Sequence, residues 1–243
     1  VTGMPAAPIA AAVPRVATLH DILFLRPDAF SAPDPLAPDA AWLAETSRAL
    51  RESAAVLAPS RWLADLARSR VPGLAPQVVP NGSATVAEAA TTAVAVPAID
   101  GRVVALLGAI GPHKGGDLVH EVARRLEGTG IVLVVVGYLE SRFHPGWEIP
   151  GRLFVHGAFP ESDAGALLRA YGACLVLMPN RVPESFSYAL SDAWSAGVPV
   201  LAAPAGALAE RIGAHGGGWL LPEDFDAAAI ASAVRELAGG ARE

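Results

Sequence analysis

The feature that most constrains the fold of this chain is a series of short apolar runs that alternate with longer helix-like segments from residue 100 onward. The runs are apolar at nearly every position, as in VVALLG from Val103 and IVLVVVG from Ile131. A continuous apolar run is typical of a strand that is buried on both faces of a parallel sheet. This part of the chain is therefore predicted to be a doubly wound α/β domain.

Further strands are expected in this part at LFVHG from Leu153, CLVLMP from Cys174 and VPVLAAP from Val198. The expected helices are GDLVHEVARRLEG from Gly116, SDAGALLRAYG from Ser162, SFSYALSDAWSAG from Ser185 and DAAAIASAVRELAGG from Asp226. A polar, aromatic loop with Arg142, His144 and Trp147 is expected after the second strand.

The first hundred residues predict a smaller α/β unit with three strands, in VPRVATLHDILFL, AAVLAPS and QVVPNG. Helices are expected from Trp42 to Arg51 and over RWLADLARSR, which Ser60 can cap with its hydroxyl. Three strands are few for a doubly wound sheet, and Val1 reads as the middle of an element, so we expect an incomplete first domain. The domains are predicted at residues 1–97, ending in an Ala/Thr/Val linker from Ser83, and at residues 98–243.

Composition excludes several classes of protein. With 52% hydrophobic residues and a net charge of −6, the chain can build a core and has no basic run for nucleic acid. The apolar runs are far below the roughly 20 residues of a membrane span, and the first residues lack the charged region of a signal peptide. Cys174, the one cysteine, is expected to be buried, which suits a reducing compartment. We therefore expect a cytoplasmic protein and leave membrane association open.

The loops after the predicted strands are the first place to look for a ligand site, because parallel sheets bind ligands at the carboxyl ends of their strands. The loop GAIGPHKGGD holds four glycines, which could let a ligand approach the backbone, and Lys114, whose charge suits phosphate. The glycines are Gly108, Gly111, Gly115 and Gly116. The alternative is a Gly-rich turn with a solvated lysine.

Two acids, Glu184 and Asp192, are eight residues apart in the segment VPESFSYALSDAWSAG. If the segment is helical from Glu184 on, they are roughly 12 Å apart along the axis, about the reach of a nucleotide sugar. The alternative makes Glu184 a first-turn acid favoured by the helix dipole and Asp192 a solvated acid.

Other polar residues give weaker signals. His20, at the end of a predicted strand, could bind a ligand hydroxyl or be held by a neighbouring carbonyl. The remaining histidines are too scattered for a metal cluster, and the Asp224 and Asp226 pair is better explained as a helix cap. We therefore expect no metal site.

Taken together, these loops resemble the C-terminal domain of the retaining family-4 (group 1) glycosyltransferases with the GT-B fold. That family has a Gly-rich loop ending in Lys-Gly, then Pro-Glu-x-Phe-Gly with a second acid eight residues after the glutamate, and then Ala-Gly-x-Pro-Val. Here these read LGAIGPHKGG and VPESFSYALSDAWSAGVPV, and the resemblance covers residues 76–225. It implies two Rossmann-like domains, the first incomplete in this chain.

The resemblance also implies roles for individual residues. Lys114 would bind the donor diphosphate, Glu184 the transferred sugar and Asp192 the ribose. Backbone N–H groups of Ser185, Phe186 and Ser187 would surround the sugar and phosphate. Lys114, Glu184 and His20 are the catalytic candidates, and the further donor-binding candidates are Gly108, Gly111, Arg181 and, near the base, Gly157.

The sequence departs from the family pattern at three positions. Ala109 stands where an arginine is frequent, and Arg181 is the candidate to replace it. The second acid is Asp192 rather than glutamate. Ser187 replaces a glycine, which disfavours a glycine-like backbone conformation there.

The sequence therefore predicts a glycosyltransferase that moves a sugar from a nucleoside diphosphate sugar to a hydroxyl of a glycan, lipid or small molecule, with retention and without a metal or other cofactor. The expected context is polysaccharide or glycoconjugate synthesis. Two alternatives stay open, a nucleotide-sugar-binding module without catalysis and a GT-B-like nucleotide-sugar epimerase.

Overall fold

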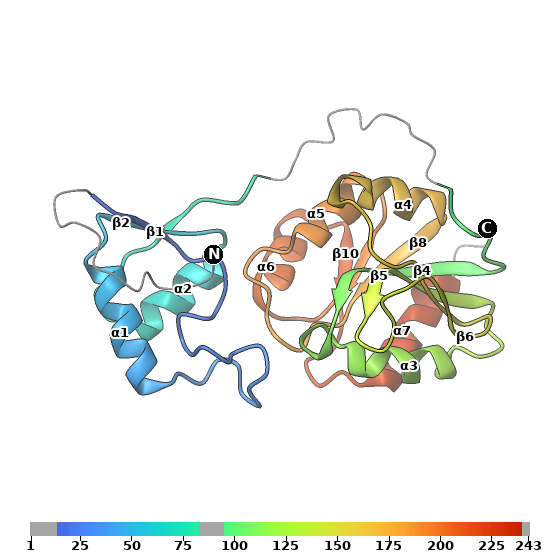
Figure 1. Cartoon of the computed structure of the whole chain (residues 1–243), viewed down its shortest axis with the longest axis horizontal. Coiled ribbons are helices and arrows are strands. Elements are labelled where there is room, and N and C mark those ends of the chain that lie inside the picture. Colours follow the sequence, from blue (N-terminus) through green and yellow to red (C-terminus); the bar gives the residue numbers. More distant parts are fainter. Residues whose placement is uncertain (1–13, 83–94, 240–243) are drawn as a thin grey trace. The chain divides into compact units, whose positions relative to one another are not determined.

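A computed structural model describes residues 14–82 and 95–239 of the chain. These residues form two compact units (Figure 1). The first holds the residues up to Gly82 together with Glu184–Phe186, and the second holds the others. Most of the predicted linker lies outside the described residues, and so does most of the segment considered as a signal peptide.

The first unit is built on a three-stranded parallel sheet of order β1-β2-β3, with two helices. The elements are β1 (Val16–Thr18), α1 (Ala40–Arg51), β2 (Ala55–Ala58), α2 (Arg61–Arg70) and β3 (Gln77–Val78). The three predicted strands are confirmed, although β1 ends at Thr18 rather than at His20. The cap is confirmed too, because the Ser60 hydroxyl accepts a hydrogen bond from the Leu63 N–H at 3.2 Å.

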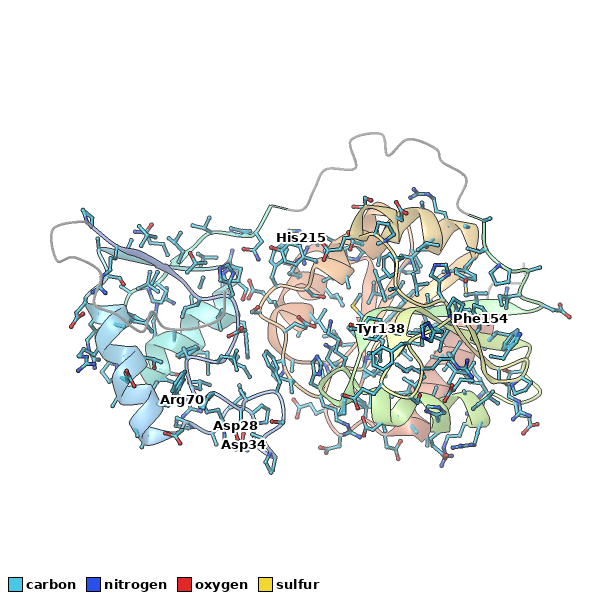
Figure 2. The ribbon with its side chains drawn as sticks, viewed as in Figure 1. Asp28, Asp34, Arg70, Tyr138, Phe154 and His215 are labelled. Carbon is cyan, nitrogen blue, oxygen red and sulfur yellow. The ribbon has the colours of Figure 1, made fainter. Side chains whose placement is uncertain are left out.

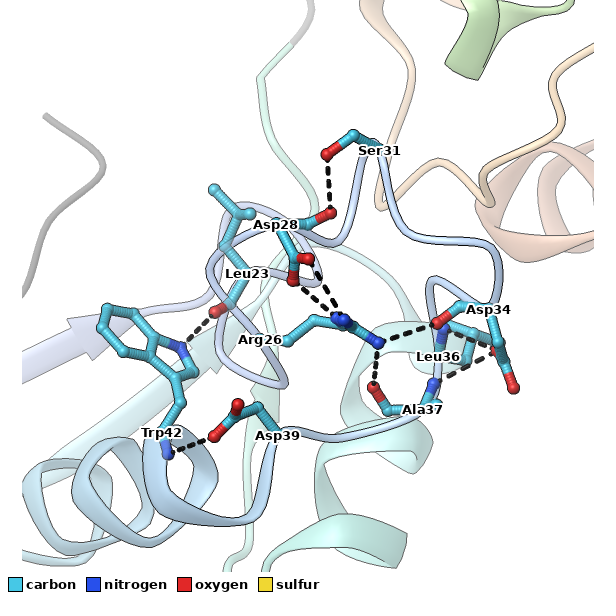
Figure 3. A network of polar contacts seen from close by, with 9 residues as sticks. All are labelled: Leu23, Arg26, Asp28, Ser31, Asp34, Leu36, Ala37, Asp39 and Trp42. Carbon is cyan, nitrogen blue, oxygen red and sulfur yellow. Dashed lines mark hydrogen bonds and ion pairs between the residues drawn. The ribbon is translucent and has the colours of Figure 1, made fainter.

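The Pro-rich loop between β1 and α1 is held by polar contacts around Arg26. Two acidic residues, Asp28 and Asp34, both lie on this loop (Figure 2). The Arg26 guanidinium binds both oxygens of Asp28, at 2.7 and 3.1 Å, and two loop carbonyls at 3.5 Å (Figure 3). The Trp42 indole of α1 donates to the Leu23 carbonyl at 2.7 Å. The loop is thus fixed to α1 without being a regular element.

The second unit is built on a seven-stranded sheet of order β10-β9-β8-β4-β5-β7-β6. Its strands are β4 (Arg102–Ile110), β5 (Ile131–Leu139), β6 (Gly146–Ile149), β7 (Leu153–Val155), β8 (Ala173–Met178), β9 (Val200–Ala202) and β10 (Gly218–Leu220). Every pair of neighbours is parallel except β6 and β7. The parallel sheet predicted from the apolar runs is therefore confirmed.

Helices cover both faces of this sheet, with α3 and α7 on one side and α4, α5 and α6 on the other (Figure 1). They are α3 (Gly116–Arg125), α4 (Ala164–Ala170), α5 (Tyr188–Ser195), α6 (Gly206–His215) and α7 (Ala227–Gly239), with 3-10 turns η1 (Pro112–Lys114) and η2 (Glu161–Asp163). Alternate residues of β4 enter different cores, since Val104 and Leu106 face α3 and α7 while Val103 and Ala105 face the other side. This is why the strand is apolar at every position.

Four details differ from the sequence predictions. Helix α5 begins at Tyr188, not near Glu184, because the backbone at Ser187 is not helical. Helix α6 and strand β10 were not predicted, and strand β6 lies in the segment expected to be a loop. Cys174 is exposed rather than buried, since it is the second residue of β8 and burial of the strand begins one residue later. None of the described helices is both long and apolar enough to cross a membrane.

Candidate functional site

The candidate site lies where the order of the strands reverses. The chain runs from β4 to β5 on one side and later returns to β8 on the other side of β4. The crossovers on either side of β4 cover opposite faces of the sheet, and open parallel sheets bind ligands beside the loops at such a point. Here these are the loops that follow β4 and β8. These loops are residues 111–116 and 179–183, which include Lys114 and Arg181.

The two loops are bonded to each other through their backbones. The N–H groups of Arg181 and Val182 both donate to the carbonyl of His113, each at 3.0 Å. A Cβ atom placed on Gly115 would lie 2.3 Å from the Pro179 carbonyl oxygen. Lys114, the residue before Gly115, is the last residue of the 3-10 turn η1. The contacts between the two loops therefore fix the position of its backbone.

The glycines of this region serve different purposes. Gly115 and Gly116 make room for protein backbone, since a Cβ on Gly116 would lie 2.6 Å from the Ile110 carbonyl oxygen. A Cβ on Gly111 would lie 3.2 Å from the His113 ring. Only Gly108, of these four, has open space where a side chain would be, with a φ of 106°. The expected close approach of a ligand is thus physically available at Gly108.

Arg181 lies against the first turn of α3 rather than alone in the loop. Its guanidinium binds both carboxylate oxygens of Asp117, at 2.6 to 3.1 Å. The bond to Asp117 raises the pKa of Arg181, so the side chain stays cationic. Ala109 is exposed at the end of β4. The structure therefore places a cation at the loop after β8, paired with Asp117, and its role as a substitute for arginine at position 109 stays a prediction.

Lys114 is the only lysine in the chain, because the other seventeen of the 18 basic residues are arginines. It is half-buried, and its backbone N–H donates to the Gly111 carbonyl at 2.9 Å. Compact charge and three rotatable donors distinguish an ammonium from the planar guanidinium. The sequence thus uses this side chain at a single place, beside the N-terminus of α3.

The backbone of Ser187 has φ 69° and ψ 94°, and it is the only non-glycine with positive φ in the described ranges. The glycine-like backbone conformation, which the serine was expected to disfavour, is therefore present here. The Ser187 hydroxyl caps α5 through the Leu190 N–H at 3.4 Å, and the Ser187 carbonyl accepts from Arg211 at 2.8 Å. These contacts offset the unfavourable backbone geometry.

Asp192 is half-buried in the middle of α5. Burial, and then the nearby charge of Glu161, raises the pKa of its carboxyl above the ordinary value. The predicted helical separation of roughly 12 Å from Glu184 is wrong, since only the part from Tyr188 to Asp192 is helical and spans about 6 Å. An acid kept where its charge is disfavoured is typical of a binding site.

Glu184, Ser185 and Phe186 connect the loop after β8 to α5, and their contacts group them with the first unit. His20 also belongs to the first unit, two residues beyond β1, and is exposed. The roles of these residues toward a donor or acceptor remain predictions.

The end of β7 carries a pair that the sequence did not reveal. His156 Nδ1 lies 2.8 Å from the Tyr171 hydroxyl, and burial lowers the pKa of His156 while it raises the pKa of Tyr171 to about 12. Both side chains are thus uncharged at neutral pH. Gly157 follows with φ 91°, and a Cβ there would lie 2.9 Å from Pro145 Cδ. Close packing against Pro145 explains why this position has no side chain. The contact of Gly157 with a nucleotide base stays a prediction.

The described residues contain no group of three or more His, Cys, Asp or Glu side chains that could hold a metal. The Asp226 carboxylate accepts from the Ala229 N–H at 2.8 Å, which confirms that it caps α7. Arg211 and Asp117 were missed by the sequence analysis. Asp117 could have been noticed as an acid in a first helical turn, whereas Arg211 lies on a helix that was not predicted.

Comparison with known proteins identifies the family. The sequence model of the family described as "Glycosyl transferases group 1" matches residues 93–239, nearly all of the second unit. A comparison with curated protein sequences finds no match.

Solved structures share the fold. Sucrose-phosphate synthase from Thermosynechococcus elongatus matches with TM-score 0.71 and 19% identity, over 93% of this chain and 58% of that one. Anabaena HepE, solved with UDP and glucose, matches with TM-score 0.64 and 20% identity over 92% and 61%. A UDP-forming trehalose-phosphate synthase from Burkholderia vietnamiensis gives 0.65 and 13% over 94% and 61%.

The chain thus spans about three fifths of the length of these three structures. The two sheets, parallel at every pair of strands except β6 and β7, and their helices confirm the predicted α/β, GT-B fold class. With a family match over more than half of its residues, the chain belongs to the group 1 glycosyl transferases.

Proposed function

We propose that this chain transfers a sugar from a nucleoside diphosphate sugar to a hydroxyl of a glycan, lipid or small-molecule acceptor, with retention of configuration. The observation that carries the proposal is the pair of loops bonded together at the reversal of strand order, with Lys114 in one and Arg181 in the other. Family membership and the HepE structure with UDP and glucose support a nucleotide sugar as donor.

In this proposal the donor diphosphate lies beside Lys114, with Arg181 as the second cation. Asp192 accepts hydrogen bonds from the ribose hydroxyls, and Glu184 from hydroxyls of the sugar. Backbone N–H groups of Ser185, Phe186 and Ser187 surround the sugar and phosphate. Gly108 and Gly111 let the ligand approach the end of β4, where Gly108 has open space, and Gly157 lies near the base.

The reaction breaks the bond between the anomeric carbon and the diphosphate oxygen and forms a bond from that carbon to the acceptor oxygen. The acceptor hydroxyl gives its proton to an oxygen of the departing diphosphate, and the nucleoside diphosphate leaves as an anion. Fixed positive charge and N–H donors stabilise the charge that develops on this leaving group, so we propose that no metal is required. His20, in the first unit, is proposed to act on the acceptor side.

The single lysine makes a sharp test possible. A reagent that acylates amines can modify only Lys114 and the chain's N-terminal amine, and the variant K114R identifies the signal from Lys114 by mass spectrometry. We expect UDP or GDP to protect Lys114 from acylation and the acylated protein to lose most of its affinity for the diphosphate. Acylation of Lys114 that is unaffected by saturating nucleoside diphosphate would remove it from the site.

Catalysis is tested separately with Glu184→Ala. We expect this variant to keep its fold and its affinity for the nucleoside diphosphate but to lose sugar transfer and slow donor hydrolysis. Hydrolysis by the native chain distinguishes an enzyme from a binding module, and unchanged turnover in the variant would contradict the proposed role of Glu184.

A further inference from the structure

One arginine, Arg211 of α6, contacts α5 at three residues of a single helix face. Its Nη1 donates to the Ser187 carbonyl and its Nη2 to the Ser191 hydroxyl, both at 2.8 Å. The guanidinium carbon lies 5.2 Å from the centroid of the Trp194 ring. Positions 187, 191 and 194 follow the i, i+4, i+7 spacing of one face. The side chain therefore lies along this face of α5, from its N-cap to its last turn.

The first of these contacts is to the residue with the unusual backbone. Ser187 has φ 69° and ψ 94°, a region that non-glycine residues rarely occupy. Such a conformation persists only where surrounding contacts hold it. The Ser187 side chain contributes a long hydrogen bond of 3.4 Å to the Leu190 N–H. The bond from Arg211 to the Ser187 carbonyl is shorter and comes from a charged donor, so it is the stronger of the two.

This bond also fixes the direction of the next N–H group. The peptide unit is planar and trans, so the Tyr188 N–H points opposite to the Ser187 carbonyl. With the carbonyl directed toward Arg211, the Tyr188 N–H is directed away from that side chain. This N–H belongs to the first residue of α5.

Arg211 is itself held in place. Trp194, under its guanidinium, donates its indole N–H to the Gly217 carbonyl at 3.0 Å. The ring of His215, one turn after Arg211 on α6 (Figure 2), meets the Trp194 ring edge-on at 6.3 Å. Burial lowers the pKa of Arg211, although a guanidinium remains charged in proteins. Burying part of a charged side chain costs free energy unless hydrogen bonds compensate for it.

We propose that Arg211 is a positioning residue for the donor site, which holds the Ser187 backbone in the conformation that a glycine would adopt unaided and so sets the backbone direction where the donor-binding segment enters α5. Arg211 does not touch the donor itself. The inference rests on the proposed function, and it explains why serine is tolerated at position 187.

A double-mutant cycle tests the proposal on the full chain, with UDP and GDP as probes in calorimetric titration. Arg211→Met keeps a long apolar stem but removes the bonds to α5. We expect R211M to weaken binding about tenfold, and to weaken it only about two- to threefold when combined with S187G, because residues in direct contact couple. Glycine reaches this backbone geometry without strain, so it needs the arginine less.

The matched control is Arg235→Met. Arg235 also donates to a backbone carbonyl, that of Arg125 at 3.1 Å, but on α7. We expect R235M to bind both probes as the native chain does. Equal effects of R211M in the serine and glycine backgrounds would overturn the proposal, and so would a lower melting temperature with unchanged affinity.

Amide hydrogen exchange in the unliganded chain gives a second readout that needs no activity. We expect R211M to increase exchange at the Leu190 amide, which the Ser187 hydroxyl caps, and Ser191→Ala to have a smaller effect. Unchanged exchange at Leu190 would overturn the proposal even if binding were lost. Conversely, a native chain that binds no nucleoside diphosphate would contradict the proposed function, while exchange would still decide whether Arg211 holds Ser187.

Discussion

At the scale of single residues, the second unit keeps two charged groups where burial disfavours charge. Burial raises the pKa of Asp192 and lowers the pKa of Arg211. Burial is the main cause of each shift, and both side chains lie on or against α5. Groups of this kind reduce folding stability in exchange for binding, which is typical of functional sites.

Asp192→Asn should separate these two effects. Because the pKa of Asp192 is raised in the folded chain, folding favours its protonated form, and the stability linked to it is present at low pH and lost as pH rises through the folded pKa. We therefore expect D192N to be more stable than the native chain near neutral pH, with a difference that shrinks as pH falls through the raised folded pKa and is lost below about 4, the ordinary value.

The same variant should bind the donor less well. Loss of a charged acceptor for the ribose hydroxyls should weaken UDP or GDP binding about tenfold or more. Denaturant titrations at several pH values and calorimetric binding measure both effects. Lower stability at neutral pH would contradict the assignment of burial as the cause of the shift.

At the scale of elements, the site depends on two loops that can meet only because Gly115 has no side chain. Gly115 has φ 77°, and a Cβ would lie 2.3 Å from the Pro179 carbonyl oxygen. Gly128 has a similar φ of 74° but open space around it. The two glycines therefore separate the cost of the backbone conformation from the cost of the close approach.

Gly128→Ala should lower the free energy of unfolding by about 1 kcal/mol, the cost of a left-handed residue with a side chain. Gly115→Ala should lower it by about 3 kcal/mol or more, because two backbones must also move apart. Urea unfolding of both variants measures the difference, and binding of UDP or GDP should fall only in G115A. Equal destabilisation would mean that the contact with Pro179 is easily relieved.

The elements that the sequence predicted are those with a simple physical signature. The runs of β4, β5 and β8 are apolar on both faces because two cores cover them, and Ser60 and Asp226 cap helices as expected. The start of α5 was misplaced because it depends on a contact between Ser187 and Arg211, which are 24 residues apart. Long-range contacts of this kind leave no local pattern.

At the scale of the whole molecule, the two units differ in how complete a core each contains. Both hydrophobic clusters of the second unit are made of residues from its own strands and helices. They fill both faces of a seven-stranded sheet, whereas the first unit has three short strands and two helices. The family match falls on the second unit as well. The unit with the larger core thus also holds Lys114, Arg181 and Asp192 of the candidate site, whereas His20 and Glu184–Phe186 group with the first unit.

A polypeptide of residues 93–239 should therefore fold on its own. We expect a single cooperative thermal transition, since domains with their own core of this size usually unfold in two states. The polypeptide should still bind UDP or GDP through Lys114 and Asp192. Its affinity should fall below that of the full chain, because Glu184–Phe186 group with the first unit and lose those contacts here. Circular dichroism and calorimetric titration check both points. A polypeptide without a cooperative transition would show that the second unit needs the first unit in order to fold. A K114A version of the polypeptide that binds equally well would show that its affinity for UDP or GDP does not depend on Lys114.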